Sequence, residues 1–171
     1  MAIDLSEVGT KLEQGRDIIV AMCGRLDDEG WRWRPAEGEW SLLEVINHIA
    51  DEEHYDFRTR IDLLVHHPDT EWPRLDPEGW AVEHRYYELD PQESLQRFVE
   101  ERATSLAWLQ DLGDVDWDAT YAHRSGPLRA GDLVVSWLVH DDLHARQMLH
   151  IHHQRSLAIG APYSAAYAGA W

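Results

Sequence analysis

The chain has 171 residues, of which 44% are hydrophobic and 27% charged, a size and composition typical of one globular domain with a buried core. Its 32 acidic and 15 basic side chains give a formal net charge of -17, which would repel nucleic acids and anionic membranes over most of the surface. Composition therefore disfavours a nucleic-acid or membrane partner, and a small-molecule substrate is expected instead.

The sequence gives no indication of a secreted or membrane-spanning protein. The longest apolar stretch, at 133–139, is interrupted by Ser136, and no basic segment followed by an apolar run opens the chain. The single cysteine, Cys23, excludes an internal disulfide and fits a reducing cytoplasm. We expect a cytoplasmic protein in which Cys23 is a buried, inert residue rather than a reactive thiol.

The first predicted element is an amphipathic helix. From Leu5, apolar residues recur at spacings of three and four up to Leu26, and this pattern predicts a helix that ends near Gly30. A tryptophan-rich loop follows. Its indole rings either line a substrate entrance or pack over the end of the domain, and packing is the favoured interpretation. These residues are Trp31, Trp33 and Trp40.

A second helix is predicted between Ser41 and His66. Ser41 and the glutamate three residues later form a capping-box signature, and Pro68 ends the helix. Residues 68–90 contain prolines and a glycine and no sustained periodicity, so we expect a long connection with a short helix that begins at Asp76 and Pro77. A connection of this length is typical of a functional segment or a crossover.

Two more helices complete the prediction. Asp90 and Pro91 begin a helix to about Leu112, and after a second loop a long helix runs from about 130 to 155. No alternating strand pattern and no internal repeat occurs, so the sequence predicts a single all-α domain, a four-helix bundle with its core at about 5–155. The tail, 161–171, is expected to pack on this domain or on a second copy in a possible homodimer.

The histidines of the second and fourth helices form a candidate metal site. His140 and His144 lie one helical turn and about 40° apart, on the stripe that carries Leu133 and Trp137 and faces the interior. His48 is expected to point inward as well, on the side of its helix that carries Val45, Glu52 and Tyr55.

Three interior imidazoles suit a borderline cation such as Zn²⁺, Ni²⁺ or Co²⁺, with one coordination position left open. The alternative is three core histidines with separate hydrogen bonds. The last helix is not an HExxH zinc site, because Asp141 replaces the glutamate. His150, His152 and His153 fall off the interior stripe and are expected to be largely solvated and incidental.

Two motifs resemble the DinB-like superfamily. Residues 35–48 match its opening pattern P-x-x-GEWS-x-x-E-x-x-x-H, and HDDLHARQ at 140–147 is similar to its final-helix pattern H-D-x-x-H-A-R-Q. The agreement extends from about residue 5 to 155. The resemblance implies a four-helix bundle that binds one divalent metal through His48, His140 and His144. In that superfamily a glutamate often stands where this chain has Asp141, and the shorter carboxylate is expected to alter a contact beside the metal.

The resemblance leaves three functions open, since members of the superfamily include bacillithiol S-transferases, mycothiol-dependent maleylpyruvate isomerases and proteins described as metal-dependent hydrolases. In the first, Zn or Ni activates a low-molecular-weight thiol for transfer to a small electrophile, with Arg58 and Arg146 holding the thiol cofactor; the alternative for these arginines is a solvated helix face. Arg58, Arg60, Arg85 and Arg146 are the basic residues that would form a local cationic patch.

In the second, a hydrolase activates water at the metal, and Glu52 either accepts a proton from that water or fixes a histidine tautomer. The third function is a non-catalytic metal-binding stress-response module.

Overall fold

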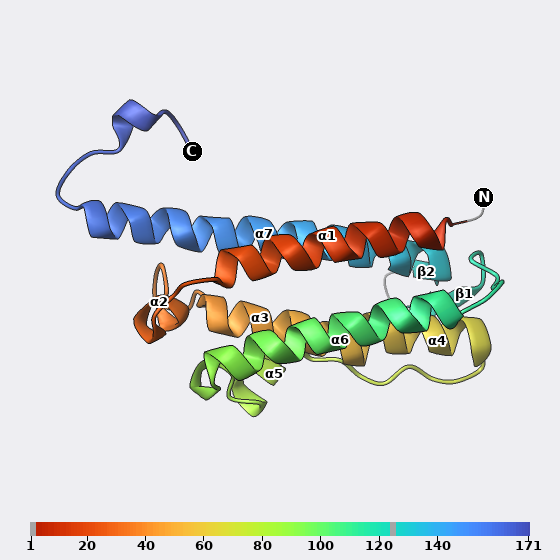
Figure 1. Cartoon of the computed structure of the whole chain (residues 1–171). Helices are drawn as coiled ribbons and strands as arrows, with labels where there is room; N and C mark the ends of the chain where they lie inside the picture. Colours follow the sequence, from red (N-terminus) through yellow and green to blue (C-terminus); the bar gives the residue numbers. More distant parts are fainter. Residues whose placement is uncertain (1–2, 124–125) are drawn as a thin grey trace.

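Four long helical rods form a bundle in the computed structural model, which describes residues 3–123 and 126–171. Figure 1 shows α1 and α7 running side by side, next to a layer made by α6 and the long rod that includes α3 and α4. The predicted four-helix bundle with a long connection between its second and third helices is confirmed. The rods are α1 (Leu5–Cys23), α3–η1–α4 (Leu42–Asp51, Glu52–Arg58 and Thr59–His66), α6 (Pro91–Asp111) and α7 (Ala130–Gly160).

The side chains that the sequence predicts as N-caps occupy those positions at the starts of their helices. Ser41 and Glu44 form a reciprocal capping box at the start of α3. Asp90 accepts backbone hydrogen bonds at the start of α6, at 2.8 Å from Gln92 and 3.0 Å from Glu93. In the long connection, Asp76 caps α5 (Pro77–Glu83), which is followed by the 3₁₀ turn η2 (Tyr86–Glu88).

The first helix is shorter than predicted. α1 ends at Cys23 rather than near Gly30, and a separate helix, α2 (Asp28–Arg32), follows. Arg25 adopts the left-handed conformation, φ +64°, with which helices commonly end. Asp27 then accepts a hydrogen bond from the backbone of Gly30 and so begins α2. The apolar pattern continued past this break because Leu26, which follows the end of α1, also packs against the core.

Two short strands stand where the sequence predicts only a loop. β1 (Thr120–His123) pairs antiparallel with β2 (Gly126–Arg129), with Thr120 opposite Arg129 and His123 opposite Gly126. The prediction was wrong because four residues are too few for a clear alternation of apolar and polar side chains. Tyr121 of this hairpin stacks on Trp72 of the long connection, with 3.9 Å between the ring centroids.

The middle of the second rod is π-helical. Residues Glu52–Arg58 form this segment between α3 and α4, and it widens the helix so that one additional residue is accommodated. A regular α-helix would place Tyr55 on the same face as His48. The Tyr55 side chain instead is 44% exposed, so the prediction that it faces inward was wrong, while Phe57 and Ile61 return to the core.

A buried polar layer crosses the bundle between two apolar clusters. Along α6, for example, Phe98 belongs to one cluster and Leu109 to the other, and the fully buried Arg102 lies between them. On α7, Trp137 and Met148 belong to opposite clusters, with Asp141 between them. His140 and His144 of α7 lie in the same interval, and the ring of His48 on α3 packs against both of them, so the candidate site lies beside this polar layer.

Within this layer, Arg102 of α6 contacts each of the other three rods. Its guanidinium donates to both carboxylate oxygens of Asp141 at 2.8 Å and to Glu53 at 2.9 Å, and it also donates to the Leu12 carbonyl of α1. Burial lowers the pKa of Arg102, but the two carboxylates outweigh this effect and raise it. Asp141 therefore forms a buried ion pair with Arg102.

Gly15 of α1 leaves room for this ion pair. A Cβ atom at position 15 would lie 2.1 Å from Asp141 Oδ2, and that oxygen is held by Arg102. Gly15→Ala should therefore lower the free energy of unfolding by about 1–3 kcal/mol despite the better helix propensity of alanine. Thermal unfolding followed by circular dichroism measures this. Gly9→Ala is the matched control, because its Cβ would meet only Leu106 Cδ2 at 3.8 Å; equal melting temperatures for the two variants would contradict the steric argument.

The C-terminal tail is exposed apart from one aromatic contact. Trp171 stacks on His153 of α7, with ring centroids 4.0 Å apart, whereas Tyr163 and Tyr167 are largely exposed. The tail thus touches its own α7 through Trp171, and packing on a second copy remains a prediction. Among the helices that the structure describes, none has the length and apolar character needed to cross a bilayer.

Candidate metal centre

Three histidines from two rods converge in the middle of the bundle. The potential ligand nitrogens of His48, on α3, and of His140 and His144, on α7, all lie within 4.8 Å of one another. His140 Nε2 and His144 Nε2 are 3.0 Å apart, and the rings of His48 and His144 have centroids 4.8 Å apart. The structure thus brings together the three residues that the sequence singled out, from positions nearly one hundred residues apart.

The environment keeps these imidazoles neutral. Burial lowers the pKa of His48 to about 3 and that of His140 to about 2, with the neighbouring histidines adding to the shift. Burial lowers the pKa of His144 as well. A neutral ring is the form that binds a metal, because the coordinating nitrogen must carry a free lone pair.

The geometry fits a divalent cation. Ligand nitrogens at about 2.0–2.1 Å from a tetrahedral ion are roughly 3.3 Å apart, so small rotations of the three rings would suffice. His48 is only 7% exposed, and its Nδ1 atom is buried with no hydrogen-bond partner among the described residues. Unpaired buried nitrogens are costly, and this one indicates that the histidine group is incomplete. The group can therefore hold a metal ion.

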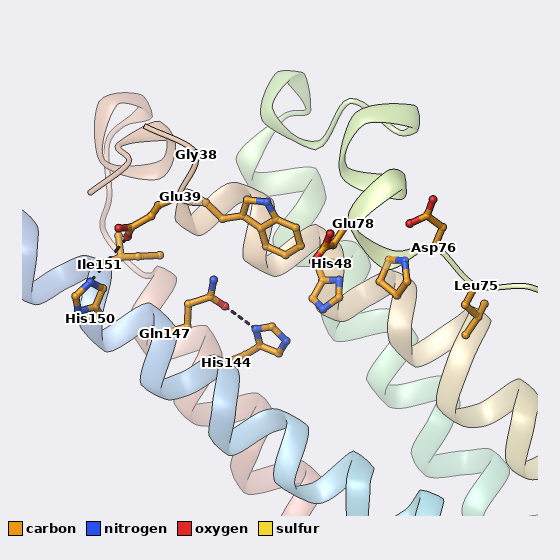
Figure 2. A pocket seen from close by; sticks show the side chains of 12 residues that line it. Gly38, Glu39, His48, Leu75, Asp76, Glu78, His144, Gln147, His150 and Ile151 are labelled. Carbon is orange, nitrogen blue, oxygen red and sulfur yellow. Dashed lines mark hydrogen bonds and ion pairs between the residues drawn. The ribbon is translucent and has the colours of Figure 1, made fainter. Parts of the chain in front are cut away.

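An open pocket reaches the histidines from the surface. Its volume is about 730 Å³, and His48 and His144 form part of its wall. Figure 2 shows these two side chains facing each other between α3 and α7. The pocket provides access to the centre and enough room for a small molecule. Its other lining residues are Gly38, Glu39, Trp40, Leu75, Asp76, Pro77, Glu78, Gln147, His150 and Ile151.

Comparison with known proteins identifies the family. The sequence profile described as the DinB superfamily matches residues 11–148, which include all three histidines. The chain belongs to the DinB superfamily. A comparison with curated protein sequences gave no significant match.

Two solved structures share the fold of this DinB superfamily protein. YfiT from Bacillus subtilis, described as a probable metal-dependent hydrolase with an unusual four-helix bundle topology, has a TM-score of 0.78 at 16% identity, over 91% of each chain. A mutant of a mycothiol-dependent maleylpyruvate isomerase has a TM-score of 0.66 at 16% identity, over 85% of this chain and 61% of the isomerase chain. At these identities the comparison shows a common fold.

Gln147 fixes the orientation of one candidate ligand in this DinB superfamily protein. Its side-chain oxygen lies 2.8 Å from His144 Nδ1, and this contact is drawn in Figure 2. When Nδ1 carries the proton and donates to Gln147, the Nε2 atom of His144 is left with its lone pair directed at His140. Such a partner commonly sets the tautomer of a metal-bound histidine.

Gln147→Leu should therefore weaken metal binding by about 10-fold to 100-fold. The substitution removes the acceptor for His144 Nδ1 but leaves all three histidines in place. Metal affinity can be measured by competition with a chromogenic chelator. Gln147→Glu, which keeps an acceptor oxygen, is the matched control and should retain most of the affinity. Unchanged affinity in Gln147→Leu would show that the contact has no positioning role.

Asp51 holds the pocket wall that comes from the long connection. This buried carboxylate accepts hydrogen bonds from His84 Nδ1 at 2.7 Å, from the Tyr86 hydroxyl and from Arg97 Nη1 at 2.6 Å. His84 directly follows α5, and Tyr86 is the first residue of η2. Asp51 thereby ties the segment that supplies Asp76, Pro77 and Glu78 to the same helix as His48.

Glu52 follows the candidate ligand His48 by four residues, but its side chain interacts with Asp56. Burial and the neighbouring Asp56 carboxylate raise the pKa of Glu52 to about 8. Asp56 in turn pairs with Arg60 at 3.1 Å. Glu52 does not line the described pocket. Its part in proton transfer or in fixing a histidine tautomer stays a prediction.

The arginines considered as cofactor ligands do not line this pocket either. Arg58 pairs with Glu101 at 2.8 Å and bonds to Ser105, both on α6. Arg146 is exposed on α7. Arg60 and Arg85, the other two arginines considered for a cationic patch, pair with Asp56 and Glu88.

Several site residues escaped sequence reasoning. His150 lines the pocket, with Nε2 3.9 Å from Glu39 Oε2, and His152 bonds to the Met22 carbonyl at 2.8 Å. These histidines and His153 are half-buried rather than largely solvated. Trp40 both packs on the core and lines the pocket, 5.1 Å from His48. The GEWS motif contains Glu39 and Trp40 and was the available signal, whereas the local pattern predicted a helix start at Asp76 and Pro77 but not their place in the pocket.

Proposed function

We propose that this DinB superfamily protein is a metal-dependent enzyme that hydrolyses a small molecule, with His48, His140 and His144 as the metal ligands. The observation that carries the proposal is the convergence of three neutral imidazoles beside an open pocket, with no carboxylate or thiolate completing the group among the described residues. A divalent ion such as Zn²⁺ or Ni²⁺ with an open coordination position lowers the pKa of water and supplies a nucleophile near neutral pH.

The charge of the pocket favours hydrolysis over thiol transfer. Holding an anionic thiol cofactor requires a cationic or strongly polar mouth, and the lining residues include Glu39, Asp76 and Glu78 but no arginine or lysine. The description of YfiT as a probable metal-dependent hydrolase supports the same choice. Thiol-dependent transfer is the second candidate, because the fold is shared with a mycothiol-dependent enzyme.

Within this proposal the chain's own residues have separate tasks. Gln147 orients His144, and Asp51 holds the wall formed by the long connection. Glu52 is not assigned a task in this proposal, because it does not line the pocket.

The proposal predicts metal-dependent hydrolysis of carboxylic esters or amides without added thiol. The tag-free protein, loaded with Zn²⁺ or Ni²⁺, would be screened with neutral and cationic substrates. Activity should fall at least about 100-fold on chelation, since the nucleophile depends on the metal. His144→Ala should behave like the chelated protein, and His67→Ala, an exposed histidine outside the pocket, should retain activity.

Other outcomes separate the alternatives. Consumption of a low-molecular-weight thiol with a chlorinated electrophile, dependent on the metal, would replace hydrolysis by S-transfer. A metal-dependent rise in melting temperature with no turnover in either screen would overturn the enzymatic proposal and leave a non-catalytic metal-binding module.

A further inference from the structure

The pocket beside the histidines carries negative charge on two walls. Glu39 comes from the loop before α3, and Asp76 and Glu78 come from the start of α5. Figure 2 shows Glu39 near His150 and Glu78 near His48, so the two carboxylates lie at separate places along the pocket wall. No lysine or arginine lines this described pocket. Away from the proposed metal ion, the charged groups that a bound molecule would meet are therefore carboxylates.

These carboxylates are not all engaged by the protein. Asp76 caps α5 and accepts a hydrogen bond from the Gly79 backbone at 3.1 Å. Glu39 has only the long contact with His150, 3.9 Å. Glu78 has no hydrogen-bond or ion-pair partner in the part of the chain that the structure describes. Glu39 and Glu78 are thus available to a ligand, whereas Asp76 is largely used in the fold.

Two neighbouring residues connect this pocket with the proposed metal centre. His48 lines the same pocket and is 7% exposed, and its Nδ1 atom is buried without a partner among the described residues. The Trp40 ring lies 5.1 Å from the His48 ring and lines the pocket too. Indole is the side chain that attracts cations most strongly through its ring face. Beside the proposed reaction centre, the pocket offers carboxylates and an aromatic surface.

We infer that this pocket selects substrates that carry a positively charged group, such as an ammonium, and rejects anionic ones. The inference rests on the proposed function for the reacting end of the substrate. Glu39 and Glu78 attract the cationic end, Trp40 packs against its apolar stem, and an anionic group at the same place would be repelled without a counter-ion.

Three hydroxamic acids of matched length test the selection by binding rather than turnover. A hydroxamate binds divalent metals, so aminocaproic, caproic and adipic monohydroxamic acids present a cationic, a neutral and an anionic tail from the same anchor. Isothermal titration of the Zn²⁺-loaded protein should rank them in that order, with the cation about tenfold tighter than the neutral compound. Equal affinities, or tightest binding of the anionic compound, would overturn the inference.

A paired variant locates the effect. Glu39→Gln/Glu78→Gln should bring the three affinities together while leaving that of caproic hydroxamic acid nearly unchanged. The matched control, Glu13→Gln/Glu83→Gln, changes the net charge equally at exposed positions that do not line the pocket and should keep the ranking. Persistence of the ranking in the Glu39/Glu78 variant would refute the assignment to these residues.

A metal-free measurement separates this inference from the metal proposal. Hexylammonium, hexanol and hexanoate would be titrated into metal-free protein, with the Trp40 indole signal followed by heteronuclear NMR. Stronger binding of hexylammonium in protein that takes up no metal would uphold the charge selection and sink the metal centre. Metal uptake without any charge preference in either titration would uphold the metal centre and overturn the charge selection.

Discussion

His144→Ala is expected to abolish tight metal binding. The wild-type protein, purified without an affinity tag, should contain close to one equivalent of Zn or Ni per chain. Four-ligand zinc sites contribute roughly 10–16 kcal/mol in binding, so each ligand accounts for about 3 kcal/mol and its loss should weaken binding by about 100-fold to 1000-fold. The remaining pair, His48 and His140, cannot replace His144, because no described carboxylate or cysteine joins the group.

Elemental analysis after dialysis against a weak chelator measures the occupancy directly. His67→Ala is the matched control, since it removes an exposed imidazole from the end of α4 and leaves the centre intact. Circular dichroism would verify that both variants are folded. Full metal content in His144→Ala would refute the assignment of His144 as a ligand, and with it the three-histidine centre.

Arg102→Met is expected to cause the largest loss of stability. The guanidinium is fully buried and lies between the buried Glu53 and Asp141 carboxylates. Methionine fills similar space but leaves two carboxylates without a counter-charge, which should cost about 3–5 kcal/mol. For a chain of this length, that corresponds to a fall in melting temperature of about 6–20 °C.

Two further variants test the cause. Arg129→Met, at an arginine whose side chain is 55% exposed and pairs with Asp132, should change the melting temperature far less, because exposed ion pairs are screened by water. Adding Glu53→Gln and Asp141→Asn to Arg102→Met should recover part of the lost stability, since the repelling charges are removed. A similar effect of Arg102→Met and Arg129→Met would contradict the role assigned to the buried ion pair.

Features that depend on residues within a single helix could be predicted from the sequence. Helical spacing alone pairs His140 with His144, and local caps predict the starts of α3, α5 and α6. His48 required the resemblance to the superfamily as well as the apolar face of its helix, because no local spacing connects it to α7. The metal-ligand assignment itself stays a prediction until metal is measured.

The features that could not be predicted from the sequence depend on contacts between segments that are far apart in the chain. Glu78 reaches the pocket because Asp51 ties the long connection to α3, and no pattern within residues 68–90 encodes that hydrogen bond. The partner of Asp141 is thirty-nine residues away on α6. Charged residues in a helix pattern are normally interpreted as solvent-facing, so Arg102 gave no sign in the sequence that it is buried.

The π-helical segment at Glu52–Arg58 has the character of a one-residue insertion that the bundle has absorbed. Insertions within packed helices normally rotate everything beyond them by about 100° and expose apolar side chains. Here the wide turn confines that rotation, so that His48 before it and Ile61 after it both face the interior. Relatives with a regular helix at this point should align with this chain only through a single gap placed between the first metal-ligand motif and α4. The length of the rod α3–η1–α4, and not only its composition, is therefore a variable through which members of the superfamily can diverge while keeping their histidines in place.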